Sequence, residues 1–289
     1  MATALIVNPR ASGVDETRIE SVRAVLGDPR LLRTEQAGHA TELTREAESW
    51  AETIYVFSGD GGFNEVVNGA SGRVPLGFVP GGGTSVLPRA LGLPRDPAAA
   101  ARRLAAGRER RISLGRANGR RFTFSCGIGI DAEAVRRIDA RGRREDGKRP
   151  GDLVFALTIG RLVVSGAYAE PALEVEGLGR AAFALVGNLA PYTYAGRIGI
   201  KPHPPLTPES GLDLVAPERF RLRSLPRFGA YVVRGRGADR APGVLYLHDL
   251  DRAVIRCDRP LPLQVDGEDL GDVTEVLVES ERDALTVLV

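Results

Sequence analysis

The chain has 289 residues, of which 43% are hydrophobic and 26% are charged, and its formal net charge is +2. This length accommodates two domains with a sizeable core, and the near-neutral charge gives no indication of nucleic-acid binding. Cys126 and Cys257 are too few for a disulfide framework or a paired-cysteine metal site, which favours buried free thiols in a reducing compartment. The N-terminus lacks the features of a secretion signal and no stretch approaches the roughly 20 apolar residues of a membrane span, so we expect a cytoplasmic protein.

The first 110 residues alternate strand and helix patterns, which predicts an α/β domain with a parallel sheet. Short apolar runs indicate strands, and apolar residues at helical spacing indicate helices. The predicted strands are 4–7, 30–34, 53–57 and 76–79, and the predicted helices are 15–26, 39–50, 63–68, 85–91 and 96–106.

After about residue 110 the pattern changes to extended runs punctuated by glycine, which predicts an antiparallel sandwich or barrel as a second domain. The predicted strands lie within 110–117, 120–130, 171–177, 181–188, 252–258, 261–268, 272–280 and 284–289. Helical patterns cover 132–138 and 150–165; the second is amphipathic and fits packing on a core better than a lipid-facing role.

The stretch FSGDGGFNEVVNGA, residues 57–70, follows a buried strand and precedes a helix. Gly59, Gly61 and Gly62 allow a tight turn and close backbone approach to a ligand, and the amides that begin the helix favour an anion. The Asp60 carboxylate beside a phosphate would be repulsive without a cation, so the pattern indicates phosphate together with Mg²⁺. An ordinary glycine-rich turn, with Asp60 as helix N-cap and Glu65 in the first turn, explains the same residues.

Further segments also allow either a functional or a purely structural interpretation. Asn8 and the Ser12-Gly13 turn of NPRASG follow the first strand, and a second glycine-rich loop follows the strand at 76–79. The acidic segment VDGEDLG, residues 265–271, contains Asp-Gly, which is also a common hairpin turn. Seven arginines and lysines between 136 and 149 indicate either a solvated loop or a segment that meets nucleotide phosphates or anionic lipid headgroups.

In this order the segments resemble the diacylglycerol kinase catalytic-domain family, which includes bacterial lipid kinases and sphingosine kinases. SGDGGFNEVVNG resembles the family pattern GGDGT-x-NEV-x-NG, and PGGGTSVLPRALGLP resembles P-x-G-T-x-N-x-x-A-R-x-LG-x-P. The resemblance runs through nearly the whole chain; its other segments are NPRASG, Thr34 with GHATEL, CGIGIDAEAV, KRPGDLVFAL, the segment from VGNLAPYTYAG to ESGLDL, and VDGE.

This resemblance implies an ATP-binding α/β domain over 1–110, completed by a C-terminal strand at about 280–289, and a β-sandwich lipid-substrate domain over 111–279. It implies transfer of the γ-phosphoryl of ATP to a lipid hydroxyl with Mg²⁺, as in phospholipid biosynthesis. Asp60 would act through Mg²⁺, and the VDGE turn would supply the general base, with Asp266 as first choice and Glu268 as second. The implied nucleotide-binding residues are Asn8, Pro9, Ser12, Gly13, Thr34, Ser58, Gly59, Asp60, Gly61, Gly62, Asn64, Glu65, Gly82, Gly83, Thr84 and Ser85.

Several positions depart from the family pattern. Gly62 replaces the threonine of GGDGT, and Gly83 and Ser85 stand where the second loop has threonine and asparagine, with Thr84 displaced by one residue. Ser210 replaces an aspartate that relatives use for a structural Mg²⁺ together with carbonyls that fall here at Thr207 and Leu212. Because a hydroxyl is a poorer Mg²⁺ ligand than a carboxylate, the departure counts against that metal site. The neighbouring Asp213 is interpreted as either part of this segment or a surface turn residue.

Three functions therefore stay open. The first is an ATP-dependent lipid kinase that contacts the inner face of the membrane peripherally and acts on diacylglycerol, a long-chain base or another lipid alcohol. The second is an enzyme like NAD kinase, whose related fold also has a GGDG loop, and the third is a catalytically degraded lipid-binding or regulatory member of the family. A homodimer is among the candidate oligomeric states.

Overall fold

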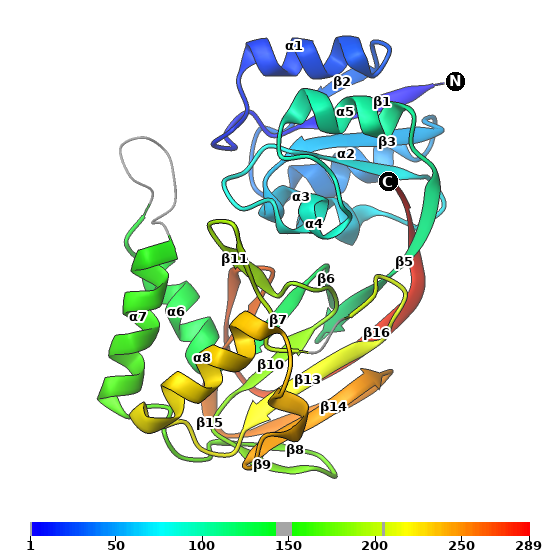
Figure 1. The fold of residues 1–289 in the computed structure, drawn as a ribbon. Helices are drawn as coiled ribbons and strands as arrows, with labels where there is room; N and C mark the ends of the chain where they lie inside the picture. Colours follow the sequence, from blue (N-terminus) through cyan, green and yellow to red (C-terminus); the bar gives the residue numbers. More distant parts are fainter. Residues whose placement is uncertain (1, 143–151, 204–205) are drawn as a thin grey trace. The chain divides into compact units, whose positions relative to one another are not determined.

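The computed structural model describes residues 2–142, 152–203 and 206–289, and it divides into two compact units. Unit 1 runs to Leu114 and takes in Arg282–Val289, and unit 2 is Gly115–Glu281. The predicted boundaries were 110 and 280. The predicted fold class is confirmed, because a parallel α/β unit is followed by a strand-rich unit (Figure 1).

Unit 1 is built on a parallel sheet whose strands lie in the order β4-β3-β1-β2. Its strands are β1 (Thr3–Val7), β2 (Arg30–Arg33), β3 (Thr53–Ser58) and β4 (Leu76–Pro80). The C-terminal end of β16 (Glu268–Leu288) continues this sheet, pairing parallel to β4 through Val287 and Leu76. The central strands are buried on both faces, as their continuous apolar runs predict.

Five helices connect and cover these strands: α1 (Glu16–Val25), α2 (His39–Ala47), α3 (Asp60–Gly69), α4 (Val86–Ala90) and α5 (Pro97–Ala105). Their beginnings follow local sequence signals. Asp15 caps α1 by accepting a hydrogen bond from the Arg18 amide, and Asp96 caps α5, which has proline at its first position. Each cap stabilises its helix by about 1 kcal/mol.

Unit 2 contains an antiparallel sheet in the order β14-β13-β10-β7-β15-β16. The hairpin of β8 and β9 attaches to β15, β6 pairs with β5, and β11 and β12 form a separate two-stranded sheet. The strands are β5 (Glu109–Ala117, shared with unit 1), β6 (Arg120–Phe122), β7 (Ser125–Ile128), β8 (Leu173–Val175), β9 (Gly179–Ala181), β10 (Ala184–Gly187), β11 (Thr193–Ala195), β12 (Ile198–Ile200), β13 (Leu212–Pro217), β14 (Val244–Leu250) and β15 (Arg252–Val265).

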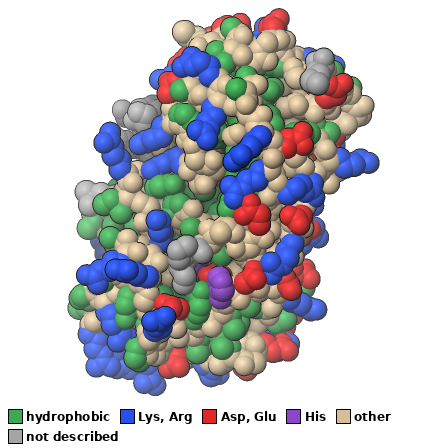
Figure 2. All heavy atoms as spheres, turned by 45° about the vertical axis from the view of Figure 1, so that its right-hand side comes forward, with side chains coloured by type: hydrophobic (Ala, Val, Ile, Leu, Met, Phe, Trp, Pro, Cys, Tyr) green, Lys and Arg blue, Asp and Glu red, His purple; other side chains and the backbone are tan. Residues whose placement is uncertain are grey.

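The helices of unit 2 are α6 (Ile130–Asp139), α7 (Asp152–Ser165) and α8 (Leu225–Arg234), with short 3₁₀ turns η1 (Leu222–Ser224) and η2 (Ala238–Arg240). Sequence patterns predicted α6 and α7 but assigned no element between 189 and 251, so α8, β13 and β14 were missed. The runs 272–280 and 284–289, predicted as two strands, belong to the single long strand β16. On the face drawn in Figure 2, basic side chains lie interspersed with acidic ones, as expected for a chain of net charge +2.

Candidate functional site

Three loops of unit 1 meet at the carboxyl ends of the parallel strands. The loop after β1 approaches the loop after β4 through a hydrogen bond of 2.8 Å from the Gly13 amide to the Gly81 carbonyl. The loop after β4 in turn approaches β3, since the Gly81 amide donates to the Ser58 carbonyl over 2.7 Å. This edge is where open parallel sheets bind ligands, and the topology brings three of the predicted segments to it.

The glycines of these loops are required by the closeness of the backbones. A Cβ added at Gly13 would lie 2.9 Å from the Gly81 carbonyl oxygen, and one at Gly82 would lie 2.9 Å from the Cα of Gly59. Side chains of any size would separate the loops at these positions. The glycine pattern therefore has a packing cause inside unit 1, in addition to any ligand that the loops bind.

Ser58 and Gly62 occupy one space. A Cβ at position 62 would overlap the Oγ of Ser58 and lie 2.9 Å from the Ser58 Cβ. Ser58 is only 2% exposed, and its Oγ has no hydrogen-bond partner among the described residues. Where the family pattern has glycine first and threonine fifth, this chain has serine first and glycine fifth, so a hydroxyl is present in the loop from the other end of the motif.

Asp60 is the first residue of α3, and Gly59 is the N-cap, so the interpretation of Asp60 as the cap is wrong. The Asp60 Oδ1 accepts a hydrogen bond of 2.7 Å from the amide of Val86 at the start of α4. The half-buried carboxylate thus joins the loops after β3 and β4. Asp60 is the acidic residue within the glycine loop, residues 59–62.

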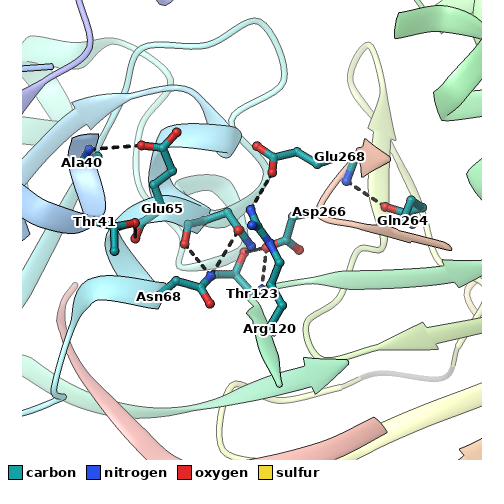
Figure 3. Close-up of polar contacts among 11 residues, drawn as sticks. Ala40, Thr41, Glu65, Asn68, Arg120, Thr123, Gln264, Asp266 and Glu268 are labelled. Carbon is teal, nitrogen blue, oxygen red and sulfur yellow. Dashed lines mark hydrogen bonds and ion pairs between the residues drawn. The ribbon is translucent and has the colours of Figure 1, made fainter. Parts of the chain in front are cut away.

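Glu65 and Asn64 lie further along α3. Glu65 belongs to the second turn and not the first, and its carboxylate accepts a hydrogen bond of 3.1 Å from the Ala40 amide at the start of α2 (Figure 3). The Thr41 hydroxyl donates to the Glu65 carbonyl over 2.8 Å. Asn64 is fully buried and accepts hydrogen bonds from Asn68. These contacts fasten α3 to α2, which fixes the helix that begins at the glycine loop.

The remaining predicted nucleotide residues line the same strand ends. Thr34 directly follows β2, is 8% exposed, and donates its amide to the Val7 carbonyl beside Asn8. In the loop after β4, the Ser85 hydroxyl bonds back to the Gly82 amide and carbonyl, so Ser85 closes its own turn. Gly83 is exposed, and a Cβ there would meet no atom within 4 Å. Pro9, Ser12, Gly61 and Thr84 belong to the same loops.

In unit 2 the VDGE segment is a two-residue hairpin turn between β15 and β16, with Val265 paired to Glu268. Asp266 and Gly267 both have positive φ, of 47° and 81°, as this type of turn requires. The Asp266 side chain is nevertheless turned inward: Asp266 is 4% exposed. The hairpin interpretation is therefore correct for the backbone, and it leaves the side chain to be explained.

The Asp266 carboxylate accepts four hydrogen bonds from the segment Thr123–Ser125. One oxygen accepts from the amide and hydroxyl of Thr123 at 2.7 and 2.9 Å, and the other from the amides of Phe124 and Ser125 at 2.9 and 3.1 Å. Four donors stabilise the ionised carboxylate and occupy its lone pairs. Glu268 is more exposed and forms an ion pair of 2.7 Å with Arg120 (Figure 3).

A buried polar network behind this turn was missed by sequence reasoning. The Asp131 carboxylate accepts hydrogen bonds from the Tyr192 hydroxyl at 2.8 Å and from Gln264 at 2.7 Å, and Gln264 in turn accepts from the Gly267 amide at 2.8 Å. Burial raises the pKa of Asp131, while the two hydrogen bonds act in the opposite direction. A polar residue in CGIGIDAEAV was the available signal, but nothing local indicated its partners.

The structure describes Thr207, Ser210 and Leu212, where the resemblance implies a structural Mg²⁺ site. The Ser210 hydroxyl lies 2.8 Å from the Thr207 hydroxyl, and the Ser210 amide donates to the Thr207 carbonyl, so the turn closes on itself. Leu212 is fully buried at the start of β13. Within the described residues, no group of three or more His, Cys, Asp or Glu side chains is arranged to hold a metal. The side-chain donors at Ser210 and Thr207 do not fit Mg²⁺, which prefers carboxylates.

Asp213 is not a surface turn residue, as one interpretation held. It is fully buried on β13, and its carboxylate accepts hydrogen bonds from the Tyr246 hydroxyl at 2.9 Å and the Asp249 amide at 3.1 Å. The Nδ1 of His248 on β14 lies 2.7 Å from the carboxylate oxygen that accepts from the Asp249 amide, within hydrogen-bond distance. Asp213 therefore fastens β13 to β14.

Residues 143–149 of the predicted basic segment lie outside the described residues. Of its described members, Arg136 pairs with Asp269 and Asp272, and Arg137 pairs with Glu133. These pairs favour a structural role for Arg136 over the phosphate-binding alternative. No helix in the described part of the chain combines the length and apolarity needed to cross a membrane.

The fold and the loops together define a class of protein. It has two domains, and the first is an α/β domain with a candidate anion site where its glycine loops meet. Comparison places the chain more narrowly. Residues 2–117 match the model of the diacylglycerol kinase catalytic domain. These residues are therefore similar to the diacylglycerol kinase catalytic-domain family, in agreement with the resemblance of the sequence motifs.

Curated relatives match in part. A Streptococcus pneumoniae protein that carries a lipid kinase name is 30% identical over 160 residues, which is 53% of each chain. A diacylglycerol kinase of Bacillus subtilis is 41% identical over 98 residues, or 32% of each chain. The matches thus span about half the length of the first relative and about a third of the second.

Solved structures match over nearly the full length. A crystal structure of a diacylglycerol kinase from Bacillus anthracis aligns with a TM-score of 0.73 over 99% of this chain and 96% of that chain, at 21% identity. A second structure from the same organism aligns with a TM-score of 0.79 at 23% identity. At this identity the likeness establishes the shared fold.

Proposed function

We propose that this protein is an ATP-dependent lipid kinase, which transfers the γ-phosphoryl group of ATP to the hydroxyl of a lipid such as diacylglycerol or a long-chain base. The observation that carries the proposal is the meeting of three loops, two of them glycine-rich, at the carboxyl edge of the unit-1 sheet. The buried Ser58 hydroxyl, which has no partner among the described residues, lies at the end of β3 directly before the glycine loop. The match of residues 2–117 to the diacylglycerol kinase catalytic domain supports the same reaction class.

The loops have the properties of a phosphate site. The first amides of α3 lack helical acceptors, and the glycines leave the backbone open to the oxygens of a phosphate. The Ser58 Oγ adds a hydroxyl donor in a place where no described protein group accepts from it. Phosphoryl transfer depends mainly on positioning and charge neutralisation, which is what amides and a hydroxyl provide.

Asp60 is the residue proposed to hold Mg²⁺ together with the nucleotide. Its carboxylate stands at the start of α3 and is oriented by the Val86 amide. Bound Mg²⁺ would supply neutralisation of the phosphate charge. The carboxylate would otherwise repel the same phosphate, so Asp60 fits a site for a nucleotide with its metal better than a site for phosphate alone.

The VDGE turn is proposed to accept the proton of the lipid hydroxyl, and its two acids offer different chemistry. Asp266 is held in a fixed orientation by four donors, which occupy the lone pairs of its carboxylate. Glu268 is half-exposed and paired with Arg120. Both acids are candidates for the base, and separate substitution of each tests which of them accepts the proton.

The test is incubation of the purified protein with γ-labelled ATP, Mg²⁺ and a total lipid extract, followed by separation of the lipids. A labelled lipid that is lost in Asp60→Asn and in either Asp266→Asn or Glu268→Gln supports the kinase and identifies the base. The matched control is Glu42→Gln, an exposed acid of α2 with no ion pair in the described structure. Labelling that persists in Asp60→Asn at the wild-type rate would refute the assigned role of Asp60.

Two other functions predict different outcomes of the same assay. With NAD added as a second acceptor, transfer of label to NAD and not to lipid would identify an NAD kinase-like enzyme. Lipid binding without transfer to any acceptor, across several triphosphates and metals, would identify a degraded, regulatory member of the family. The closed turn at Ser210 is the feature that favours this last function, because it removes a carboxylate that relatives use.

A further inference from the structure

A strongly basic surface segment of unit 2 coincides with the helix that the sequence patterns missed. Residues 219–240 contain seven arginines and one aspartate, a net charge of +6 in a chain whose total is +2. The segment comprises η1, α8 and η2, and Figure 1 draws α8 in gold in front of the strands of unit 2. Positive charge is therefore concentrated on one short segment.

One face of α8 is fixed to the core. Leu225 and Phe228 pack against the hydrophobic core of unit 2, and the Phe228 ring lies edge-on to Phe220 and Phe183 at centroid distances of 5.2 and 6.3 Å. Tertiary packing thus holds the helix in place. The helix also meets β12, where the Lys201 amide donates to the Val232 carbonyl over 2.7 Å, and several of its other side chains are exposed.

The outward face combines apolar and basic side chains. Leu222 on η1 and Val233 on α8 are 58% and 56% exposed, and the exposed Pro226 lies two turns before Val233 on the same side of α8. Arg223 and Arg234 directly follow the two exposed apolar residues. Exposed aliphatic side chains flanked by long cationic ones are typical of helices that lie in a membrane interface.

Acidic partners account for only some of the arginines. Glu170 pairs with both Arg219 and Arg221, and Arg240 pairs with Asp239. Arg227 donates to the Pro242 carbonyl. The acids within reach are thus grouped near the ends of the segment.

The guanidinium groups of Arg223, Arg234 and Arg236 form no hydrogen bond or ion pair within the described residues. All three are exposed. Uncompensated charge beside exposed Leu222 and Val233 attracts an anionic partner that also has an apolar interior.

We propose that this surface, the α8 face (Leu222, Arg223, Pro226, Arg227, Val233 and Arg234), docks the protein on anionic lipid bilayers. The charge complements anionic headgroups, and the apolar residues match the boundary between headgroups and acyl chains. A nucleic acid would use the arginines but would leave Leu222 and Val233 in water. The proposal is made for a protein that acts on lipid, and to that extent it rests on the proposed function.

The test is co-sedimentation of the full chain with phosphatidylcholine vesicles, with and without phosphatidylserine. We expect binding that needs phosphatidylserine and weakens with salt. Arg223→Gln with Arg234→Gln should weaken it by at least tenfold, from about fivefold for each arginine near the surface. Leu222→Ser with Val233→Ser should also weaken it, with unchanged thermal unfolding.

Matched controls assign the effect to this face. Arg102→Gln with Arg103→Gln removes the same charge from the exposed side of α5, and Leu157→Ser with Val164→Ser removes an equally exposed apolar pair from α7. Unchanged binding in both controls supports the α8 face. The proposal would be overturned by an equal loss of binding in either control, or by binding to neutral vesicles alone. It would also be overturned if an oligonucleotide displaced the vesicles fully and the Leu222 and Val233 changes had no effect.

Failure of docking and failure of the kinase are distinguishable, because sedimentation requires no ATP. Turnover in detergent micelles, where no bilayer has to be found, should be retained by the α8-face variants. Vesicle binding by a protein that phosphorylates no lipid would refute the kinase and support the surface. Turnover on vesicles that the α8-face variants retain in full would refute the surface and support the kinase.

Discussion

Gly62→Thr is the change that tests whether the glycine loop is built as one packed unit. It restores the residue of the family pattern, and on sequence grounds it should be harmless or slightly beneficial, since glycine is a weaker helix former than threonine. The structure predicts the opposite. The new Cβ would overlap the Ser58 Oγ and lie 2.9 Å from the Ser58 Cβ, and neither backbone can retreat because Ser58 is on a central strand.

Rotation of the Ser58 hydroxyl relieves only the first of these contacts, so an overpacking penalty of about 1–3 kcal/mol remains. Urea unfolding of the single variant should show a lower midpoint at unchanged slope. The double variant Ser58→Gly with Gly62→Thr removes both overlapping atoms and should recover most of the loss. The coupling between the two positions is then at least about 1 kcal/mol, well above the error of additivity.

Gly83→Thr is the matched control, because it makes the same substitution in the neighbouring loop, where a Cβ meets nothing within 4 Å. Its free energy of unfolding should stay within about 0.5 kcal/mol of the wild type. A Gly62→Thr variant as stable as Gly83→Thr would refute the packing argument. So would a double variant no more stable than Gly62→Thr alone.

Three further predictions concern acids with different surroundings. Because burial raises the folded-state pKa of Asp131, the stability of the wild type relative to Asp131→Asn should decrease as pH rises from 4 to 8, by at most about 1.4 kcal/mol per pH unit. A difference in urea midpoints that does not change with pH would contradict this prediction. Asp266→Asn should lower the free energy of unfolding by about 2–4 kcal/mol, since the new amide NH₂ would face the hydrogen-bond donors of Thr123–Ser125. Glu268→Gln, at a partly exposed position, should lower it by under about 1 kcal/mol, and equal losses would contradict the structural role of the buried carboxylate. Glu65→Ala should lower the stability by about 1 kcal/mol through the lost Ala40 contact while Glu65→Gln stays near wild type, and a change in the KM for ATP in Glu65→Gln would instead indicate a nucleotide contact.

The α/β half of the fold was predictable because its signals are local. The run Thr53–Phe57 is apolar and short, and it forms β3 with one added residue. The dipeptide Asp96-Pro97 marks the start of α5, where aspartate caps and proline occupies the first turn. The positions of the loops at the strand ends follow from the alternation of strands and helices.

The segment from 189 to 251 was not predictable in the same way. Helix α8 contains Pro226, Gly229 and two consecutive valines, which weaken a helical assignment from propensity. It forms because Phe228 packs on Phe220, a contact of tertiary structure. Propensity is a weak prior that such packing overrides.

The candidate site divides along the same line. The meeting of the glycine loops was implied by topology, but the inward turn of Asp266 was not, because its donors come from a segment 141 to 143 residues earlier. The Asp131–Gln264 contact likewise spans 133 residues. Patterns within a window report which residues are polar, and not which polar residues meet.

The same limit applies to the departures from the family pattern, which a sequence can only count. In space they sort into three kinds. The hydroxyl missing at Gly62 has a counterpart at Ser58, and the two residues exclude larger ones from each other's positions, so this departure is a coupled exchange. The exposed Gly83 is unconstrained by packing, and Ser210 closes its turn on Thr207 and replaces a ligand by a local contact. Only the last removes a carboxylate with no counterpart, and it lies in unit 2. The departures therefore bear on the structural metal site that the resemblance implies more than on the proposed phosphate site, and this difference separates the proposed kinase from a degraded member of the family.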